Sequence, residues 1–267
     1  MDILLDTIMG GIAGYMWPLT RISSMFMVMA VFGATTTPTR VRLLLSLTVT
    51  AAIAPVLPPM PTIELFSLTA VFVTFQQIII GVSMGFASIL LMQTFVLTGQ
   101  IIGMQTSLGF ASMVDPSSGQ QTPVVSNFFL LLTTMIFLAV DGHLVLIRMV
   151  VASFETIPVS TTGLSLTSYR LFSEFVGYMF GAALTMSLSA IVALLTINLS
   201  FGVMTRASPQ LNIFSIGFPV TMVSGLFILW LTLTPIMAHF GEVWRETQLL
   251  LCDVLLLQCS VDGGLNL

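Results

Sequence analysis

Long apolar segments, separated by short polar breaks, dominate the pattern of the chain. Crossing the hydrocarbon core of a bilayer takes a helix of about 20 apolar residues. Several of the segments approach or exceed this length, so the pattern predicts an all-α integral membrane protein. The segments cover residues 8–33, 41–57, 65–105, 124–140, 143–157, 171–205 and 213–240.

Two of these segments are too long for a simple span. As helices, residues 65–105 and 171–205 would reach about 60 and 50 Å, against a hydrocarbon core of about 30 Å. Helix tilt does not absorb an excess near twofold. Either the helices are broken or other protein covers part of their apolar surface, which favours an assembly of several subunits.

The polar breaks carry residues that end helices. Four prolines lie in residues 54–64, and the stretches 32–40, 157–168 and 205–212 combine Gly, Ser, Thr, Asn or Pro. Such residues are typical of turns and connectors.

The chain end has a different pattern. Residues 241–259 alternate polar and apolar positions, which predicts an amphipathic helix lying in the membrane interface. Residues 260–267 are expected to be disordered.

Composition supports the membrane assignment. Hydrophobic residues make up 56% of the chain and charged residues 7%, whereas soluble domains carry about 25% charged residues. Arginine supplies all seven positive charges, so nucleic-acid binding has no electrostatic basis. The start carries Asp2 and Asp6 where a secretory signal would be positive, and we expect it to enter a retained helix.

The few ionisable groups also bear on orientation and transport. Arg40 and Arg42 favour a cytoplasmic 34–42 loop and an N-terminus outside. A proton- or sodium-coupled carrier needs a carboxylate near mid-membrane, and residues 65–114, 175–205 and 207–241 contain none. Arg21, inside the first predicted helix, is expected to snorkel to the interface or to pair with a partner chain.

Two candidate reactive motifs carry little chemistry. Cys252 and Cys259 form no metal or redox motif and are expected to be apolar filler on a helix. The sequence GVSMG at 81–85 matches a nucleophile pattern, but it lies inside a long apolar helix rather than at a strand-to-helix turn. We therefore expect no catalytic residue, no metal site and no cofactor.

Paired glycines one helical turn apart predict close helix packing. Such pairs remove side chains from a stripe and let another backbone approach, within the chain or from a partner. The pairs are Gly10/Gly14, Gly81/Gly85, Gly99/Gly103 and Gly177/Gly181.

The polar run between two apolar segments, GFASMVDPSSGQQT at 109–122, requires an explanation. Unsatisfied polar groups cost several kcal/mol in lipid, so this loop lies at the surface or lines an aqueous path. Phe110 and Met113 place apolar side chains on a flexible backbone, next to the polar residues of the same loop. That combination is suited to a segment that plugs an aqueous path.

The polar loops also carry a family resemblance. The sequences GQIIGMQTSLGFASMVDPSSGQQTPVVSNF (99–128) and MTRASPQLNIFSIGFPV (204–220) resemble the FliR family of flagellar biosynthetic proteins, which includes the T-subunit of virulence type III secretion systems. The similarity extends over essentially the whole chain, including DGH at 141–143 and the stretch from Trp17 to Arg21.

The resemblance implies a subunit of a protein export gate and no enzyme. It implies long kinked helical hairpins, with a FliP-like part at about 1–165 and a FliQ-like hairpin at about 166–240. The chain would join several copies of FliP and FliQ in a helical hetero-oligomer, contact FlhB and membrane lipid, and pass unfolded flagellar proteins. Such an assembly sits in the bacterial inner membrane at the flagellar basal body, with its core raised towards the periplasm. From the residues alone, a small-molecule secondary transporter is the alternative.

The resemblance also implies which residues act. A loop matching 106–122 would project into the channel and help to close it. Its candidate residues are Gly109, Phe110, Met113, Asp115, Pro116 and Gln120. The candidates for partner contact are Gly81, Gly85, Gly177, Gly181, Arg206, Pro209, Gln210 and Asn212.

Overall fold

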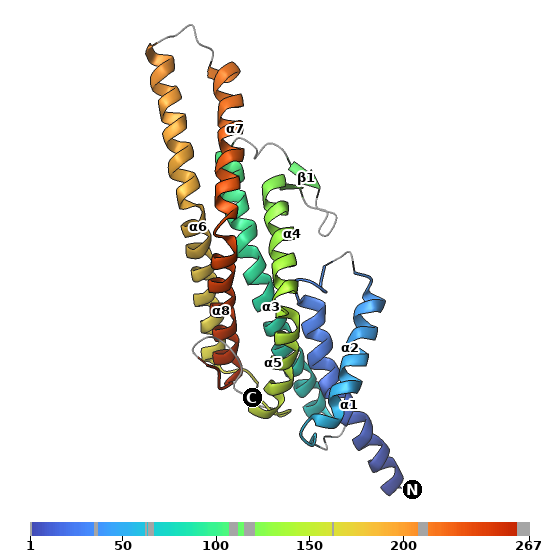
Figure 1. Ribbon diagram of the computed structural model, residues 1–267. Coiled ribbons are helices and arrows are strands. Elements are labelled where there is room, and N and C mark those ends of the chain that lie inside the picture. The colour runs from blue at the N-terminus through green and yellow to red at the C-terminus, as the bar shows by residue number, and fades with distance from the viewer. Residues whose placement is uncertain are drawn as a thin grey trace. The chain divides into compact units, whose positions relative to one another are not determined.

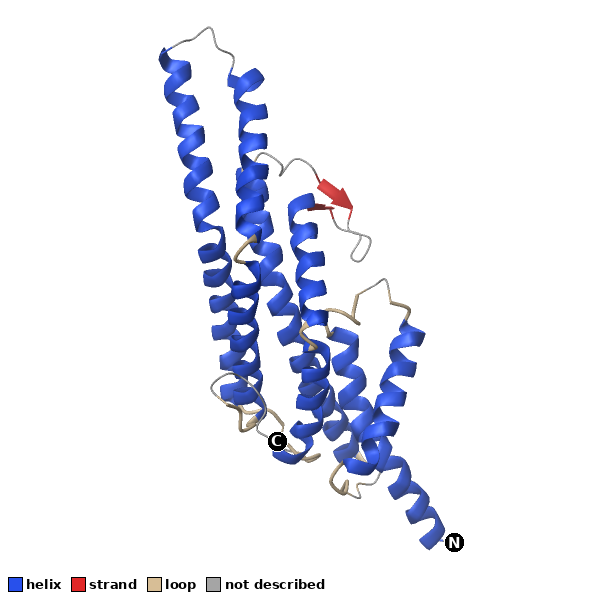
Figure 2. Cartoon of the chain, in the orientation of Figure 1, coloured by secondary structure: helices blue, strands red, loops and turns tan. Residues whose placement is uncertain are grey.

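The fold consists of eight α-helices and one short β-hairpin among the residues that the computed structural model describes (Figures 1 and 2). Those residues are 2–34, 37–61, 63, 67–106, 112–114, 121–161, 163–207 and 213–260. The elements in chain order are α1 Asp2–Val28, α2 Thr39–Ile53, the 3-10 turn η1 Ala54–Val56, α3 Leu68–Gln105, β1 Ser112–Val114, β2 Gln121–Pro123, α4 Val124–Ala139, α5 Gly142–Thr156, α6 Leu166–Ala207, α7 Ile213–Leu233 and α8 Ile236–Leu255.

The helices follow the apolar segments that the sequence pattern marks out. Among the described residues, three helical stretches are long and apolar enough to cross a membrane: Thr39–Val56, Leu68–Gln105 and Leu166–Met204. Counting the bent pairs α4/α5 and α7/α8 as one span each gives up to five. The all-helical membrane architecture is therefore confirmed.

The chain forms two compact units, each built from segments distant in sequence. Unit 1 comprises Met1–Leu90, Val140–Phe175 and Arg245–Leu267, and unit 2 comprises Leu91–Ala139 and Val176–Trp244. The helices α3, α6 and α8 contribute residues to both. The expected FliP-like and FliQ-like parts, divided at about residue 165, stay a prediction.

Unit 1 packs around a tryptophan near the middle of α1. Its core cluster joins Trp17, from α1, to the start of α3 and to the end of α5 and the connector after it. The 57–63 connector after η1 closes this cluster through Leu57, Met60 and Ile63. One end of the unit is therefore formed by the end of α2/η1, the start of α3 and the end of α5.

Unit 2 uses aromatic contacts and close helix approaches. The rings of Phe95 on α3 and Phe240 on α8 lie 6.0 Å apart, and those of Phe137 on α4 and Trp244 on α8 lie 5.4 Å apart. A Cβ added at Gly99 would lie 2.8 Å from the Cα of Ser126, so α3 and α4 approach closely there. Gly99 thus serves packing inside the chain.

The C-terminal helix differs from the expected one in its bounds and its surroundings. It starts after Pro235 and ends at Leu255, and residues such as Val243 and Leu251 on its apolar face are buried against the same chain. The helix is amphipathic, and the same chain covers its apolar face. Its place in the membrane interface stays a prediction. Of the expected disordered tail, residues 261–267 lie outside the described residues.

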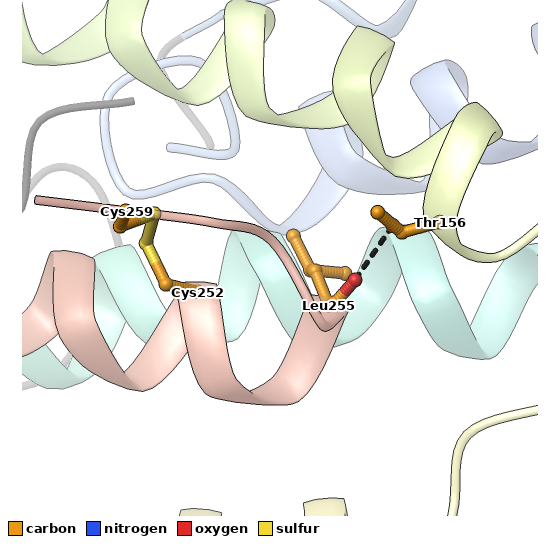
Figure 3. The surroundings of a disulfide bond; sticks show 4 residues. All are labelled: Thr156, Cys252, Leu255 and Cys259. Carbon is orange, nitrogen blue, oxygen red and sulfur yellow. Dashed lines mark hydrogen bonds between the residues drawn. A yellow bond between two sulfur atoms is a disulfide. The ribbon is translucent and has the colours of Figure 1, made fainter. Parts of the chain in front are cut away.

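The prediction for the two cysteines was wrong. Cys252 and Cys259 form a disulfide with their Cα atoms 6.2 Å apart (Figure 3). In one continuous helix, residues seven apart are separated by about 10.5 Å along the axis, too far for a disulfide. The bond forms because α8 ends at Leu255 and the chain turns back.

Candidate functional site

The loop after α3 contains a β-hairpin. β1 pairs with β2 in antiparallel register, with Met113 opposite Thr122 and Val114 opposite Gln121. Strand pairing satisfies backbone N–H and C=O groups within the loop itself, so this polar segment needs less support from water. The sequence pattern indicated a loop here and missed the strands, which are only three residues long.

The candidate plug residues lie in and around this hairpin. Met113 is on β1. Gly109 and Phe110 precede β1 and lie outside the described residues, as do Asp115, Pro116 and Gln120 in the connection between the strands. The hairpin therefore provides the frame on which the proposed plug would be carried.

The space beside Gly81 and Gly85 on α3 is occupied by other residues of the same chain. Gly81 and Gly85 are both buried. A Cβ added at Gly85 would lie 2.8 Å from the carbonyl oxygen of Met25 and 3.0 Å from the backbone nitrogen of Met29. Both contacts are on or directly after α1, so this stripe packs α1 against α3 inside unit 1. It is not open to a partner chain, which corrects the expectation for these two residues.

The glycine pair on α6 is open. Gly177 and Gly181 are exposed, and a Cβ added at either would meet no atom within 4 Å. The pair continues into a row of exposed apolar side chains spaced three or four residues apart, which we call the α6 stripe. With the two glycines, it comprises Leu184, Leu188, Val192, Leu195, Leu199 and Val203.

Another face of α6 is also apolar and is buried within the chain. Ala183, Ser187, Ala190 and Leu194 are fully buried. A helix with apolar residues on more than one face belongs in a protein interior or a membrane. The α6 stripe therefore requires a cover that the chain itself does not supply.

Two further helices of unit 2 expose apolar faces. On α4 the exposed residues recur at alternating spacings of four and three, the heptad spacing of coiled-coil seams; they are Val124, Phe128, Leu131, Met135 and Leu138. On α7 the exposed large residues include Phe218, Val223, Phe227 and Trp230.

The second polar loop joins α6 to α7. Arg206 is exposed in the last turn of α6, where a cation is favourable beside the helix C-terminus. Pro209, Gln210 and Asn212 lie outside the described residues.

The buried arginine was misjudged from the sequence. Arg21 is fully buried, and its Nε donates to Oε1 of Gln77 at 2.8 Å. Its Nη1 donates to the carbonyl and hydroxyl oxygens of Ser153, and its Nη2 donates to the carbonyl of Ile157. The guanidinium also lies 4.0 Å from the ring centre of Phe154. Arg21 neither snorkels to the interface nor needs a partner chain, because acceptors on α3 and at the end of α5 bind its guanidinium.

Unit 2 contains a mainly apolar cavity of about 270 Å³. Residues of α3, α4, α6, α7 and α8 line it, among them Phe95, Ser189 and His239. Among the described residues, no group of three or more His, Cys, Asp or Glu side chains is arranged to hold a metal ion. The described geometry provides helix surfaces and a hairpin.

Comparison with known proteins decides the family. A family model described as bacterial export proteins, family 1, matches residues 12–247. The chain is also 35% identical to the flagellar biosynthetic protein FliR of Escherichia coli (strain K12) over 242 residues, which is 90% of this chain and 92% of the relative. The chain belongs to the FliR family.

Other FliR relatives span a wide range of identity. The FliR of Pectobacterium carotovorum subsp. carotovorum is 35% identical over 91% of this chain and 93% of its own length. The FliR of Bacillus subtilis (strain 168) is 23% identical over 85% of this chain and 88% of its own length.

Membership of the FliR family confirms the functional interpretation. The chain is a membrane component of the flagellar export apparatus, and the family is non-enzymatic. The alternative of a small-molecule secondary transporter is set aside on the same ground. Membership also implies partner proteins within the export apparatus.

Proposed function

We propose that this FliR-family chain is a core subunit of the channel itself. It assembles with several copies of FliP and FliQ in the bacterial inner membrane at the flagellar basal body, in contact with FlhB. Unfolded flagellar proteins pass through the channel that the subunits enclose. The core of the assembly is raised from the bilayer towards the periplasm.

The α6 stripe carries this proposal. α6 has 42 residues and is about 63 Å long at 1.5 Å per residue. The hydrocarbon core of a bilayer is about 30 Å thick, so lipid covers about half of that length at most. Exposed apolar residues extend from Leu184 to Val203, after the open pair Gly177 and Gly181. Other protein chains are the cover that fits a surface of this length.

The chemistry of the surface favours helical partners. Open glycines allow a second helix backbone to approach closely, and the heptad spacing on α4 suits a helix that packs along it. FliP and FliQ helices would supply both covers. The exposed face of α7 would take a neighbouring hairpin in the same way.

The proposed internal division follows the helices in part. The FliQ-like part at about 166–240 begins where α6 begins, at Leu166, and contains the whole α6/α7 hairpin. The FliP-like part at about 1–165 contains α1 to α5. The expected helix at 241–259 overlaps α8, which starts five residues earlier.

The two polar loops take separate roles. The 106–122 loop helps to close the channel when no substrate fills it, through Gly109, Phe110, Met113, Asp115, Pro116 and Gln120. The loop from Arg206 through Pro209, Gln210 and Asn212 contacts FliQ or FlhB at the turn of the second hairpin. The self-paired β1 and β2 strands support the first role, since a hairpin with satisfied backbone groups can stand free in an aqueous channel.

Purification tests the assembly directly. The affinity-tagged chain, extracted in mild detergent, is expected to emerge within a large hetero-oligomer that contains FliP and FliQ. A native mass equal to that of the chain alone, or of a homo-oligomer, would contradict the proposal.

A matched pair of variants tests the α6 stripe. Leu188 is 57% exposed at the centre of the stripe. Leu188→Trp is expected to weaken partner binding by about 1–3 kcal/mol, because overpacking a close interface costs this much. Leu188→Met keeps the volume and is the control. If lipid rather than protein covers the stripe, a tryptophan at position 188 would be tolerated. Unchanged recovery of FliP and FliQ with Leu188→Trp would therefore contradict the proposal and assign the stripe to lipid.

A further inference from the structure

The chain turns back sharply after α8. Leu256 adopts a left-handed backbone conformation with φ 56°, and the N–H of Leu257 donates to the carbonyl of Cys252 at 2.8 Å. This is the hydrogen-bond pattern of a Schellman helix end. Figure 3 shows the tail running back along the last turn of α8, where Cys259 meets Cys252.

The disulfide lies at one defined end of unit 1. The hydroxyl of Thr156, at the end of α5, donates to the carbonyl of Leu255 at 2.6 Å (Figure 3). The hydroxyl of Ser168, near the start of α6, donates to the carbonyl of Val254 at 3.5 Å. The end of α8 is thereby held beside the end of α5, where Phe154 and Val159 join the core cluster of the unit.

Two arginines lie at the opposite end of the same unit. The stretch Thr39–Val56 is one of the candidate spans, and its 18 residues rise about 27 Å. Arg40 and Arg42 stand at its start. Leu57, directly after its other end, packs against the core cluster beside the end of α5. The span thus separates the arginines from the disulfide.

We infer that the end of unit 1 that carries the Cys252–Cys259 disulfide faces the periplasm and that Arg40 and Arg42 face the cytoplasm. Two independent rules agree on this orientation. Short cytoplasmic loops carry an excess of arginine and lysine. Disulfides form and persist outside the cytosol, where glutathione and thioredoxin do not reduce them. The inference rests on the inner-membrane location proposed above, but its test measures thiols and not export.

The oxidation needs a partner on the periplasmic side. A disulfide of a periplasmic thiol oxidase accepts two electrons and two protons from the thiols of Cys252 and Cys259. The intramolecular bond forms by thiol–disulfide exchange through a mixed disulfide, and the oxidase leaves as a dithiol. Cys252 is 3% exposed and Cys259 is half-buried, so Cys259 is the thiol that reaches the oxidase first.

The oxidation state of the wild-type chain is the first test. Cells are quenched in acid, and free thiols are alkylated with a heavy maleimide that shifts the chain on a gel. The chain is expected to show no free thiol in normal cells and two in a strain that lacks the periplasmic thiol oxidase. Two free thiols in normal cells, or an intact disulfide in the mutant strain, would overturn the inference.

Accessibility of single thiols is the second test. Cys252→Ala leaves Cys259 as the one thiol, and a membrane-impermeant maleimide is expected to label it in spheroplasts. The control variant combines Cys252→Ala, Cys259→Ala and Arg40→Cys, and its thiol is expected to react only after the inner membrane is opened. The reverse pattern would overturn the orientation. Recovery of FliP and FliQ with each variant is measured separately, so a failure of the proposed assembly is distinguished from a failure of this inference.

Discussion

A buried cation, Arg21, organises the core of unit 1, and among the described residues it has no carboxylate partner. Arg21 donates to a side-chain amide on α3 and to a hydroxyl and two carbonyls at the end of α5. Carbonyls at a helix C-terminus carry partial negative charge, which favours a cation there. The ring of Phe154 adds a cation–π contact. One residue of α1 thereby fixes two other elements of the unit.

Replacing Arg21 is expected to destabilise the chain itself. Arg21→Met removes the donors to the amide oxygen of Gln77, the hydroxyl of Ser153 and the carbonyl of Ile157, at a cost of about 2–4 kcal/mol in unfolding free energy. The control is Arg170→Met, which removes an exposed ion pair with Glu174 worth about 0.3–0.5 kcal/mol. Thermal unfolding of the purified chains compares them. Equal unfolding midpoints for the two variants would show that the buried network contributes nothing specific.

At the residue scale, the sequence shows which residue is unusual but does not show which partners that residue contacts. Arg21 stands out as a charge inside an apolar helix, but its acceptors are backbone carbonyls and hydroxyls distant in sequence, which no local pattern reveals. The disulfide was missed for a related reason. It depends on a chain reversal at Leu256, where a non-glycine residue takes a left-handed conformation that glycine usually supplies.

At the scale of elements, identical glycine spacing serves two purposes. Gly85 lies against the backbone of α1 and the residues after it, whereas Gly181 faces open space. The spacing predicts a close helix approach in each case and does not say whether the second helix belongs to the same chain. Burial decides this, and burial depends on tertiary packing. Gly81 and Gly85 on α3 line an internal seam, whereas Gly177 and Gly181 on α6 are exposed and form part of the surface proposed above for another subunit.

The variants Gly85→Leu and Gly181→Leu are expected to impair the protein in different ways. Gly85→Leu forces α1 away from α3, so the chain should accumulate poorly in the membrane. A Cβ at Gly181 meets no described atom within 4 Å, so the Gly181→Leu chain should accumulate normally but recover about tenfold less FliP and FliQ, a loss of about 1.4 kcal/mol in binding. Membrane abundance by immunoblot and partner recovery by affinity purification separate the two effects. Normal abundance of Gly85→Leu would refute the internal seam, and full recovery with Gly181→Leu would refute the partner surface.

At the scale of the whole molecule, apolar runs predict helices well and predict their ends less well. The segments 124–140 and 143–157 coincide with α4 and α5 to within two residues. The segment 213–240 instead divides at Thr234 and Pro235 into α7 and the start of α8, because an apolar run conceals a helix break whose only local sign is one proline. The two units also interleave distant segments, an arrangement that hydropathy along the chain does not encode.

Within unit 2, the segment that joins α3 to α4 carries the β1/β2 hairpin. A channel that carries polypeptides must hold back ions when no substrate fills it, and helices alone leave a lumen of fixed width. The pairing of β1 with β2 satisfies the backbone groups that face each other, so the hairpin can move as a body without losing those hydrogen bonds. In the plug proposed above, apolar residues of the 106–122 loop such as Phe110 are expected to exclude water.

Removing residues 110–118 tests whether the hairpin closes the channel. The deletion leaves residues 106–109 and 119–123 to join α3 to α4, so assembly with FliP and FliQ is expected to continue. The assembled gate should leak small ions and slow growth without any exported substrate, which membrane conductance and ion sensitivity measure. A second variant replaces 110–118 with glycine and serine at equal length. It should leak as well, because it keeps the connector but lacks the apolar contacts that exclude water. Tight membranes in both variants, with partner recovery equal to wild type, would show that another element of the gate forms the seal.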